Sequence, residues 1–143
     1  MKLTILQKTA LGISGLTALG IGAFILAAPH TFYAGYGIAL PQNASLLSEL
    51  RAPAAALSAF GMLMLAGIVY RGFSHSAMVV ALTVFIAFPA GRLVGIAIDG
   101  IPSGSVMAAL AFELAIAALC VTAFRPRLKL TAPDHNTLRI FTS

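Results

Sequence analysis

Three of the four acidic residues in this 143-residue chain lie within or beside long apolar runs, where an ionised side chain is expensive. They are Glu49, Asp99 and Glu113, and the same runs contain Arg51 and Arg92. A charge at the centre of a bilayer costs about 2.5 to 3.5 kcal/mol on insertion scales, so such residues face a bundle interior and have partners. In that setting they can form an ion pair, carry a proton or bind a small polar or anionic ligand.

The other residue types that carry out catalysis or bind metal ions are poorly placed. We predict His30 and His75 on opposite sides of a membrane, and His135 lies in a polar run without zinc-ligand spacing. Cys120 has no second cysteine with which to form a disulfide, and we interpret it as a buried, inert thiol. We therefore predict no cofactor and no metal ion, and an enzymatic activity has the least support.

Four apolar stretches must position the charged residues. The composition is 59% hydrophobic and 9% charged, far outside the range of soluble domains. A helix needs about 20 apolar residues to cross a bilayer, and the stretches at about 9–28, 45–70, 76–98 and 105–124 reach or approach that length. We predict an all-α fold, an integral membrane four-helix bundle that forms a single domain over residues 1–128. A flexible cytoplasmic tail is expected over residues 129–143.

The positions of lysine and arginine predict the orientation in the membrane. Lys2 and Lys8 precede the first stretch, and Arg71 lies between the second and third. Four more basic residues follow the fourth stretch: Arg125, Arg127, Lys129 and Arg139. Short cytoplasmic loops are enriched in these residues, so both termini are expected in the cytoplasm. This distribution explains the net charge of +5 without a nucleic-acid partner; membrane lipids are the expected partners, with another membrane protein or a second copy as further candidates.

Short turns predict which helices are neighbours. The segment "RGFSH" between the second and third stretches makes them antiparallel neighbours. After Asp99, Gly100 suits a helix C-cap and Pro102 prevents continuation, so a hairpin turn brings the third and fourth stretches together. Gly91 and Gly95, four residues apart, are predicted to allow close helix packing. Similar small pairs occur in the other stretches: Ala18 and Gly22, Ala55 and Ala59, Ala111 and Ala115.

Two features at the predicted outer face stay open. The second helix can begin near Asn43 or Ser45, which places Glu49 and Arg51 in its first turns, or at Pro53, which places them in the interface. The connection "PHTFYAGYGIALPQN" is rich in aromatic residues, which favour the headgroup zone. We interpret it as an anchoring segment in preference to a ligand-binding one.

The hairpin turn also sets the depth of the charges. Arg92 lies about 9 Å, and Glu113 about 12 to 15 Å, from the outer end of its helix. We predict that these two side chains pair, that Asp99 lies closer to the surface, and that Glu49 and Arg51 enter from the same side. The result would be a polar cluster in the outer half of the bundle. A structural clasp and a ligand-binding or proton-carrying site are both compatible with this arrangement.

Three sequence features resemble a known family. "SELRA" at 48–52, "GRLVGIAIDGIP" at 91–102 and the lone Glu113 in the last stretch are similar to the bacterial four-helix membrane family catalogued as domain of unknown function 4345. The matching positions are Glu49, Arg51, Arg92, Asp99, Gly100, Pro102 and Glu113. The resemblance implies the fold and a bacterial inner-membrane location, but no biochemical activity. A more distant likeness is to DoxX-like four-helix proteins, some of which have redox or assembly roles.

The sequence leaves three functional hypotheses, in order of preference. The first is a small non-catalytic accessory protein that scaffolds or assembles a membrane complex. The second is a small-molecule or proton-coupled carrier or binder that uses Glu113 with Arg92. The third is a membrane enzyme.

Overall fold

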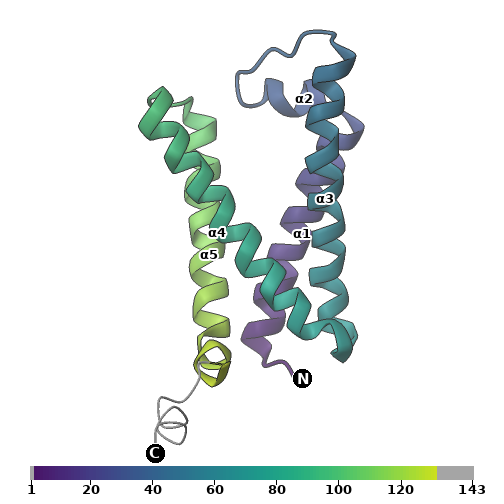
Figure 1. The fold of residues 1–143 in the computed structure, drawn as a ribbon, viewed down its shortest axis with the longest axis vertical. Coiled ribbons are helices and arrows are strands. Elements are labelled where there is room, and N and C mark those ends of the chain that lie inside the picture. The colour runs from purple at the N-terminus through teal and green to yellow at the C-terminus, as the bar shows by residue number, and fades with distance from the viewer. Residues whose placement is uncertain (1, 132–143) are drawn as a thin grey trace, which may run out of the picture.

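Four long α-helices account for most of residues 2–131, the part of the chain that the computed structural model describes (Figure 1). The elements are α1 (Ile5–Ala27), α2 (Pro29–Ala34), α3 (Ala44–Val69), the 3-10 helix η1 (Arg71–Phe73), α4 (Ser74–Asp99) and α5 (Gly104–Thr131). Four helical segments are long and apolar enough to cross a membrane: Ile5–Ala27, Ala44–Val69, Arg71–Asp99 and Gly104–Pro126. The predicted all-α fold with four such segments is confirmed within these residues.

The first helix begins earlier than its apolar run because of a capping box. The side-chain oxygen of Thr4 accepts a hydrogen bond from the Gln7 backbone N–H at 3.3 Å, and the Gln7 side chain accepts one from the Thr4 N–H at 3.1 Å. Two otherwise unsatisfied donors are thereby paired, which starts α1 at Ile5 in place of residue 9.

The start of α3 is set by Asn43, whose side chain accepts a hydrogen bond from the Leu46 N–H at 3.0 Å. Pro53 therefore lies inside the helix, and the alternative start at Pro53 is wrong. At the other end of the chain, α5 continues to Thr131, so the expected flexible tail overlaps a helix at residues 129–131. The remainder of that predicted tail, residues 132–143, lies outside the described residues.

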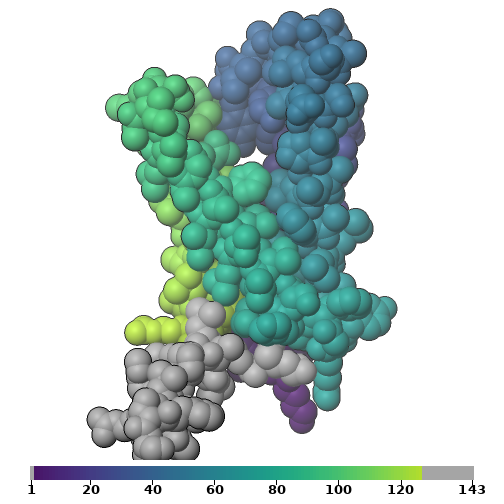
Figure 2. Space-filling model, in the orientation of Figure 1, coloured from purple at the N-terminus to yellow at the C-terminus, as the bar shows by residue number. Residues whose placement is uncertain are grey.

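The helices form two antiparallel pairs, α1 with α3 and α4 with α5. Helix α4 crosses diagonally, so that it lies against α3 at its start and against α5 at its end, and the two pairs separate toward that end (Figure 1). We call the end where α1 begins and α5 ends the terminal end, and the opposite end the α2 end. At the terminal end the Gln7 side-chain amide donates to the Ala123 carbonyl at 3.1 Å, and two turns further along α1 Ser14 Oγ lies 3.1 Å from Cys120 Sγ. The α2 end is open, and Figure 2 shows a notch there between the tips of the two pairs.

Close packing between α1 and α3 depends on small residues. A Cβ at Gly61 would lie 2.5 Å from the Leu19 backbone nitrogen and 2.7 Å from the Gly15 carbonyl oxygen. A Cβ at Gly22 would lie just as close to the Ala54 carbonyl oxygen, at 2.6 Å. Only residues without a side chain allow two backbones to approach this far, which supports helix association where lipid offers no hydrophobic drive.

The close packing predicted for Gly91 and Gly95 does not occur within the described chain. A Cβ on either glycine would meet no atom within 4 Å. Pro89 is the last buried residue of α4, and no residue from Ala90 to Asp99 is buried. The reason is the separation of the two helix pairs, which leaves this half of α4 facing outward with side chains such as Leu93 and Ile98 exposed.

Candidate functional site

Arg92 and Glu113 form a two-bonded ion pair between α4 and α5. The guanidinium donates from Nε to Glu113 Oε2 at 2.9 Å and from Nη2 to Glu113 Oε1 at 3.0 Å. The Glu113 side chain is 8% exposed and that of Arg92 is 29% exposed. This geometry is the strong, orientation-specific form of carboxylate recognition by arginine, and it confirms the predicted ion pair.

The turn between the two helices aligns the ion pair. Asp99 is the last residue of α4, and Gly100 follows with φ 94° and ψ −173°, a backbone region that is essentially restricted to glycine. Pro102 cannot donate a backbone hydrogen bond that would prolong the helix. The chain therefore reverses within four residues, and α5 begins at Gly104, so that the two side chains reach similar depth from opposite directions.

The larger polar cluster expected from the sequence does not form. Asp99 is exposed at the end of α4, and Glu49 is exposed on α3. Arg51 is also exposed, and its Nε donates to the Leu26 carbonyl oxygen at 3.2 Å. Its charge thus lies at the C-terminal turn of α1, where cations complement the helix dipole. The structure brings together only Arg92 and Glu113 of the five residues.

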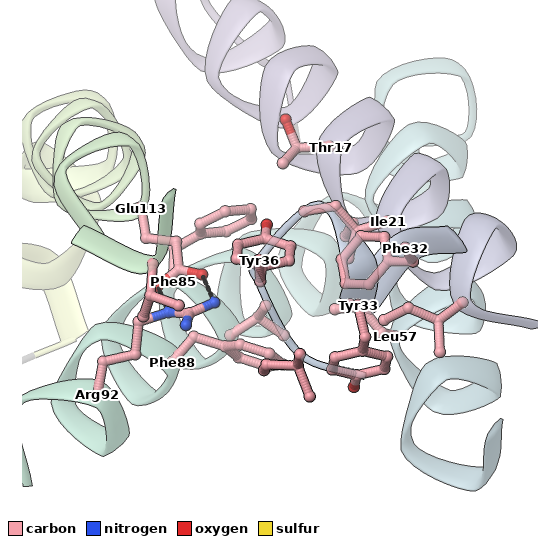
Figure 3. A pocket seen from close by; sticks show the side chains of 15 residues that line it. Thr17, Ile21, Phe32, Tyr33, Tyr36, Leu57, Phe85, Phe88, Arg92 and Glu113 are labelled. Carbon is pink, nitrogen blue, oxygen red and sulfur yellow. Dashed lines mark hydrogen bonds and ion pairs between the residues drawn. The ribbon is translucent and has the colours of Figure 1, made fainter. Parts of the chain in front are cut away.

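A cavity of about 230 Å³ lies beside the ion pair (Figure 3). Arg92 and Glu113 form its charged side, and the remaining walls are mostly apolar or aromatic. In Figure 3, Tyr36 lies between the ion pair and the group formed by Phe32, Tyr33 and Leu57. Every α-helix of the described chain contributes to the lining, so the cavity is a product of the whole fold.

The aromatic segment after α1 lines this cavity, whereas its composition favoured an anchoring role at the membrane interface. Pro29, fully buried at the first position of α2, ends α1 and turns the chain. The Phe32 ring then packs edge-on against Tyr33, with the ring centroids 5.3 Å apart, and lies 5.2 Å from the Tyr36 ring. The spacing of four residues between Phe32 and Tyr36 is the signal in the sequence that these two rings lie on one side of the segment.

The Tyr33 phenol stays neutral at neutral pH. Burial raises the pKa of this group above its ordinary value of 10.0; the positive charge of Arg92 lowers it, and Tyr36 raises it further. A neutral phenol can both donate and accept a hydrogen bond. The cavity therefore contains one ion pair and polar groups without net charge.

A second, more open hollow lies on the other side of a shared wall. Ile21, Phe32, Tyr36 and Glu113 line both spaces, and the second space continues between α1 and α5. Its remaining lining includes Phe112, which is 53% exposed on the outer surface of α5. These four residues therefore separate the cavity from a hollow that opens beside exposed side chains of α5.

One hydrogen bond connects the segment after α2 with the α4–α5 turn. Ser103 Oγ donates to the Tyr36 carbonyl oxygen at 3.0 Å. Gly37 follows with φ 76°, and the Ile38 N–H donates back to the Tyr33 carbonyl at 3.0 Å. The Ser103 bond therefore holds the aromatic segment across the open end of the bundle.

Ser103→Ala is expected to increase hydrogen exchange at the Gly37 and Ile38 amides while changing global stability by no more than about 1 kcal/mol. The reason is that the lost bond fixes this segment without contributing to the core. Hydrogen–deuterium exchange with mass spectrometry measures the effect. Ser105→Ala, an exposed serine in the next turn, is the control, and equal exchange in both variants would contradict the assignment.

These features define a class: a multi-pass α-helical membrane protein with a buried Arg–Glu ion pair in the wall of an apolar cavity. The chain matches the family model described as Domain of unknown function (DUF4345) over residues 6–124, and it belongs to this family. No curated protein and no solved structure matches it. The relation to DoxX-like proteins therefore stays a prediction.

Within residues 2–131, no three His, Cys, Asp or Glu side chains come together as a group suited to a metal ion.

Proposed function

We propose that this protein is a small non-catalytic membrane protein that binds a small, largely apolar molecule in the cavity beside Arg92 and Glu113. The observation that carries the proposal is the position of the ion pair in the wall of a space that is otherwise mostly apolar. A purely structural clasp has no need of an adjoining cavity. The binder, placed second from the sequence, is thus the function that this geometry supports best.

The size of the cavity supports a ligand built on one or two rings. An apolar cavity of about 150 Å³ accommodates benzene, and the cavity here measures about 230 Å³. Pockets for drug-sized molecules begin at about 300 Å³. A substituted ring or a small bicyclic molecule falls between these limits.

The surroundings of the cavity support entry from the bilayer. The second hollow leads from the shared wall toward exposed side chains of α5, and Tyr36 in that wall belongs to the segment held by Ser103. A small displacement of this segment would join the two spaces. An apolar molecule dissolved in lipid could then enter without crossing an aqueous phase.

The proposed location is a bacterial inner membrane with both termini in the cytoplasm. The family resemblance supports the location, and the distribution of cations supports the orientation. Lys2, Lys8 and Arg71 line one hollow at the terminal end, whereas the exposed carboxylates Glu49 and Asp99 belong to the opposite end. Cytoplasmic loops carry the excess of lysine and arginine.

Val106→Phe is expected to abolish retention of the bound molecule. Val106 lines the cavity from the first turns of α5, so a larger side chain occupies the binding space. The effect is measured by gentle extraction in detergent, followed by mass spectrometry of co-purified small molecules. The amount of bound molecule is expected to fall at least about tenfold, which corresponds to about 1.4 kcal/mol of binding free energy. Val121→Phe, on the exposed surface of the same helix, is the control and should retain the molecule.

The same extraction tests a second proposal, the accessory or assembly role. One observation favours it: the outward-facing half of α4 after Pro89 carries Gly91 and Gly95 with open space beside them, which would suit a partner helix. A membrane protein that co-purifies with wild type and with both valine variants would support this role. If the Val106→Phe variant retains the same small molecules as the wild-type protein, the binding proposal is contradicted.

A further inference from the structure

The ligand class can be narrowed by counting the charges and hydrogen bonds in the cavity wall. Both oxygens of Glu113 accept hydrogen bonds from Arg92, and the two formal charges cancel. A guanidinium has five N–H groups, and two of them are used here. Among the described residues, no other acceptor hydrogen-bonds to this guanidinium. Three N–H donors therefore have no acceptor within the described residues, and Arg92 lines the cavity in a wall that has no net charge.

We propose that the cavity selects neutral ring molecules that carry a hydrogen-bond acceptor, such as an aryl ketone, over anions and over plain hydrocarbons of the same size. This inference rests on the proposed binding function and specifies its ligand. The free donors on Arg92 would bind the acceptor atom. The aromatic side chains Phe32, Phe85 and Phe88 would contact the ring.

An anion is disfavoured because the charge of Arg92 is already compensated. A carboxylate on the ligand would bring a second negative charge next to Glu113, in surroundings where charge repulsion is poorly screened. The other titratable groups in the wall are the phenols Tyr33 and Tyr36, which supply no positive charge. A cation is disfavoured in the same way, since the carboxylate of Glu113 has both oxygens bonded to Arg92.

A plain hydrocarbon is disfavoured for a different reason. It would displace whatever solvates the free N–H groups of Arg92 and leave these donors unpaired, which is unfavourable in an apolar space. A ketone oxygen accepts from such donors without adding charge. We therefore expect the neutral molecule with an acceptor to bind more tightly than either the hydrocarbon or the anion.

Three probes that share one ring system test this order: acetonaphthone, naphthalene and naphthoate. Their binding to the full-length protein in lipid nanodiscs is measured by equilibrium dialysis, with empty nanodiscs to subtract partition into lipid. Acetonaphthone is expected to bind at least about tenfold more tightly than either of the others. Equal binding of naphthalene, or tighter binding of naphthoate, overturns the inference but leaves the binding function intact. If none of the probes binds above the empty discs, both proposals fail.

A charge-neutralising variant gives a second, independent readout. Glu113→Gln leaves Arg92 without a compensating charge, so naphthoate is expected to gain at least about tenfold in affinity and to overtake acetonaphthone. Asp99→Asn removes the same charge from the exposed end of α4 and should keep the wild-type order. If Glu113→Gln folds and keeps that order, the charge argument is overturned. If it does not fold, the ranking of probes on the wild-type protein decides.

Discussion

Arg92→Met is expected to lower the free energy of unfolding by about 3 to 5 kcal/mol and Glu113→Leu by less, whereas the double variant recovers most of that loss. Arg92→Met leaves the Glu113 carboxylate, which is 8% exposed, without its partner, while Glu113→Leu leaves an Arg92 side chain that is 29% exposed. The double variant replaces the pair with apolar side chains of similar reach. A large coupling free energy between the two positions is therefore expected.

Unfolding in mixed detergent micelles, followed by circular dichroism, measures these differences. Arg51→Met is the matched control because it removes the same group from an exposed site where the guanidinium makes a single hydrogen bond, to Leu26. It is expected to cost no more than about 1 kcal/mol. Additive effects at Arg92 and Glu113, with no recovery in the double variant, would show that the two charges do not compensate each other.

Gly22→Ala is expected to cost about 1 to 3 kcal/mol, although it adds only one methyl group. The new Cβ would lie 2.6 Å from the Ala54 carbonyl oxygen and 2.7 Å from the Ser58 nitrogen. These are backbone atoms, so relief requires α1 and α3 to move apart. The same micelle unfolding experiment measures the loss.

Gly20→Ala is the control for that experiment, since a Cβ at Gly20 meets nothing within 4 Å. Alanine has the higher helix propensity, so this variant is expected to be neutral or to gain up to about 1 kcal/mol. If both variants behave alike, the contact between α1 and α3 is looser than the structure indicates.

Length, composition and turn chemistry were sufficient to predict the four long helices and one long-range contact. Apolar runs of spanning length predict helices regardless of their packing, and the turn at Gly100 fixes which two helices face each other. With that turn in place, rise per residue alone brings Arg92 and Glu113 to similar depth. The contact was predictable because it depends on distance along two adjacent helices.

Properties that depend on rotation about a helix axis were not predictable. A helix that is apolar all round gives no periodic signal for its inward face, so the small-residue pairs could not be ranked. Gly22 lies at a helix contact, whereas Gly91 and Gly95 do not. The same ambiguity led to the wrong position for Arg51, which lies beside the end of α1 in place of the expected polar cluster.

The cavity could not be predicted because it results from the angle between the two helix pairs. Its walls come from all the α-helices. The sequence does not give the angles at which these helices cross, so it does not show whether the interior is filled or partly empty. Only the aromatic segment 32–36 carried a hint, and its composition is equally typical of a membrane-interface anchor.

The placement of the buried core has a mechanical consequence. The core side chains of α4 end at Pro89. The two helix pairs are therefore held together by the core at one end and by the Ser103 hydrogen bond at the other. A slight widening at the open end would disturb few buried side chains. For the proposed binding function, selectivity would therefore come from the hydrogen bonds that a ligand forms with Arg92, and much less from close shape complementarity.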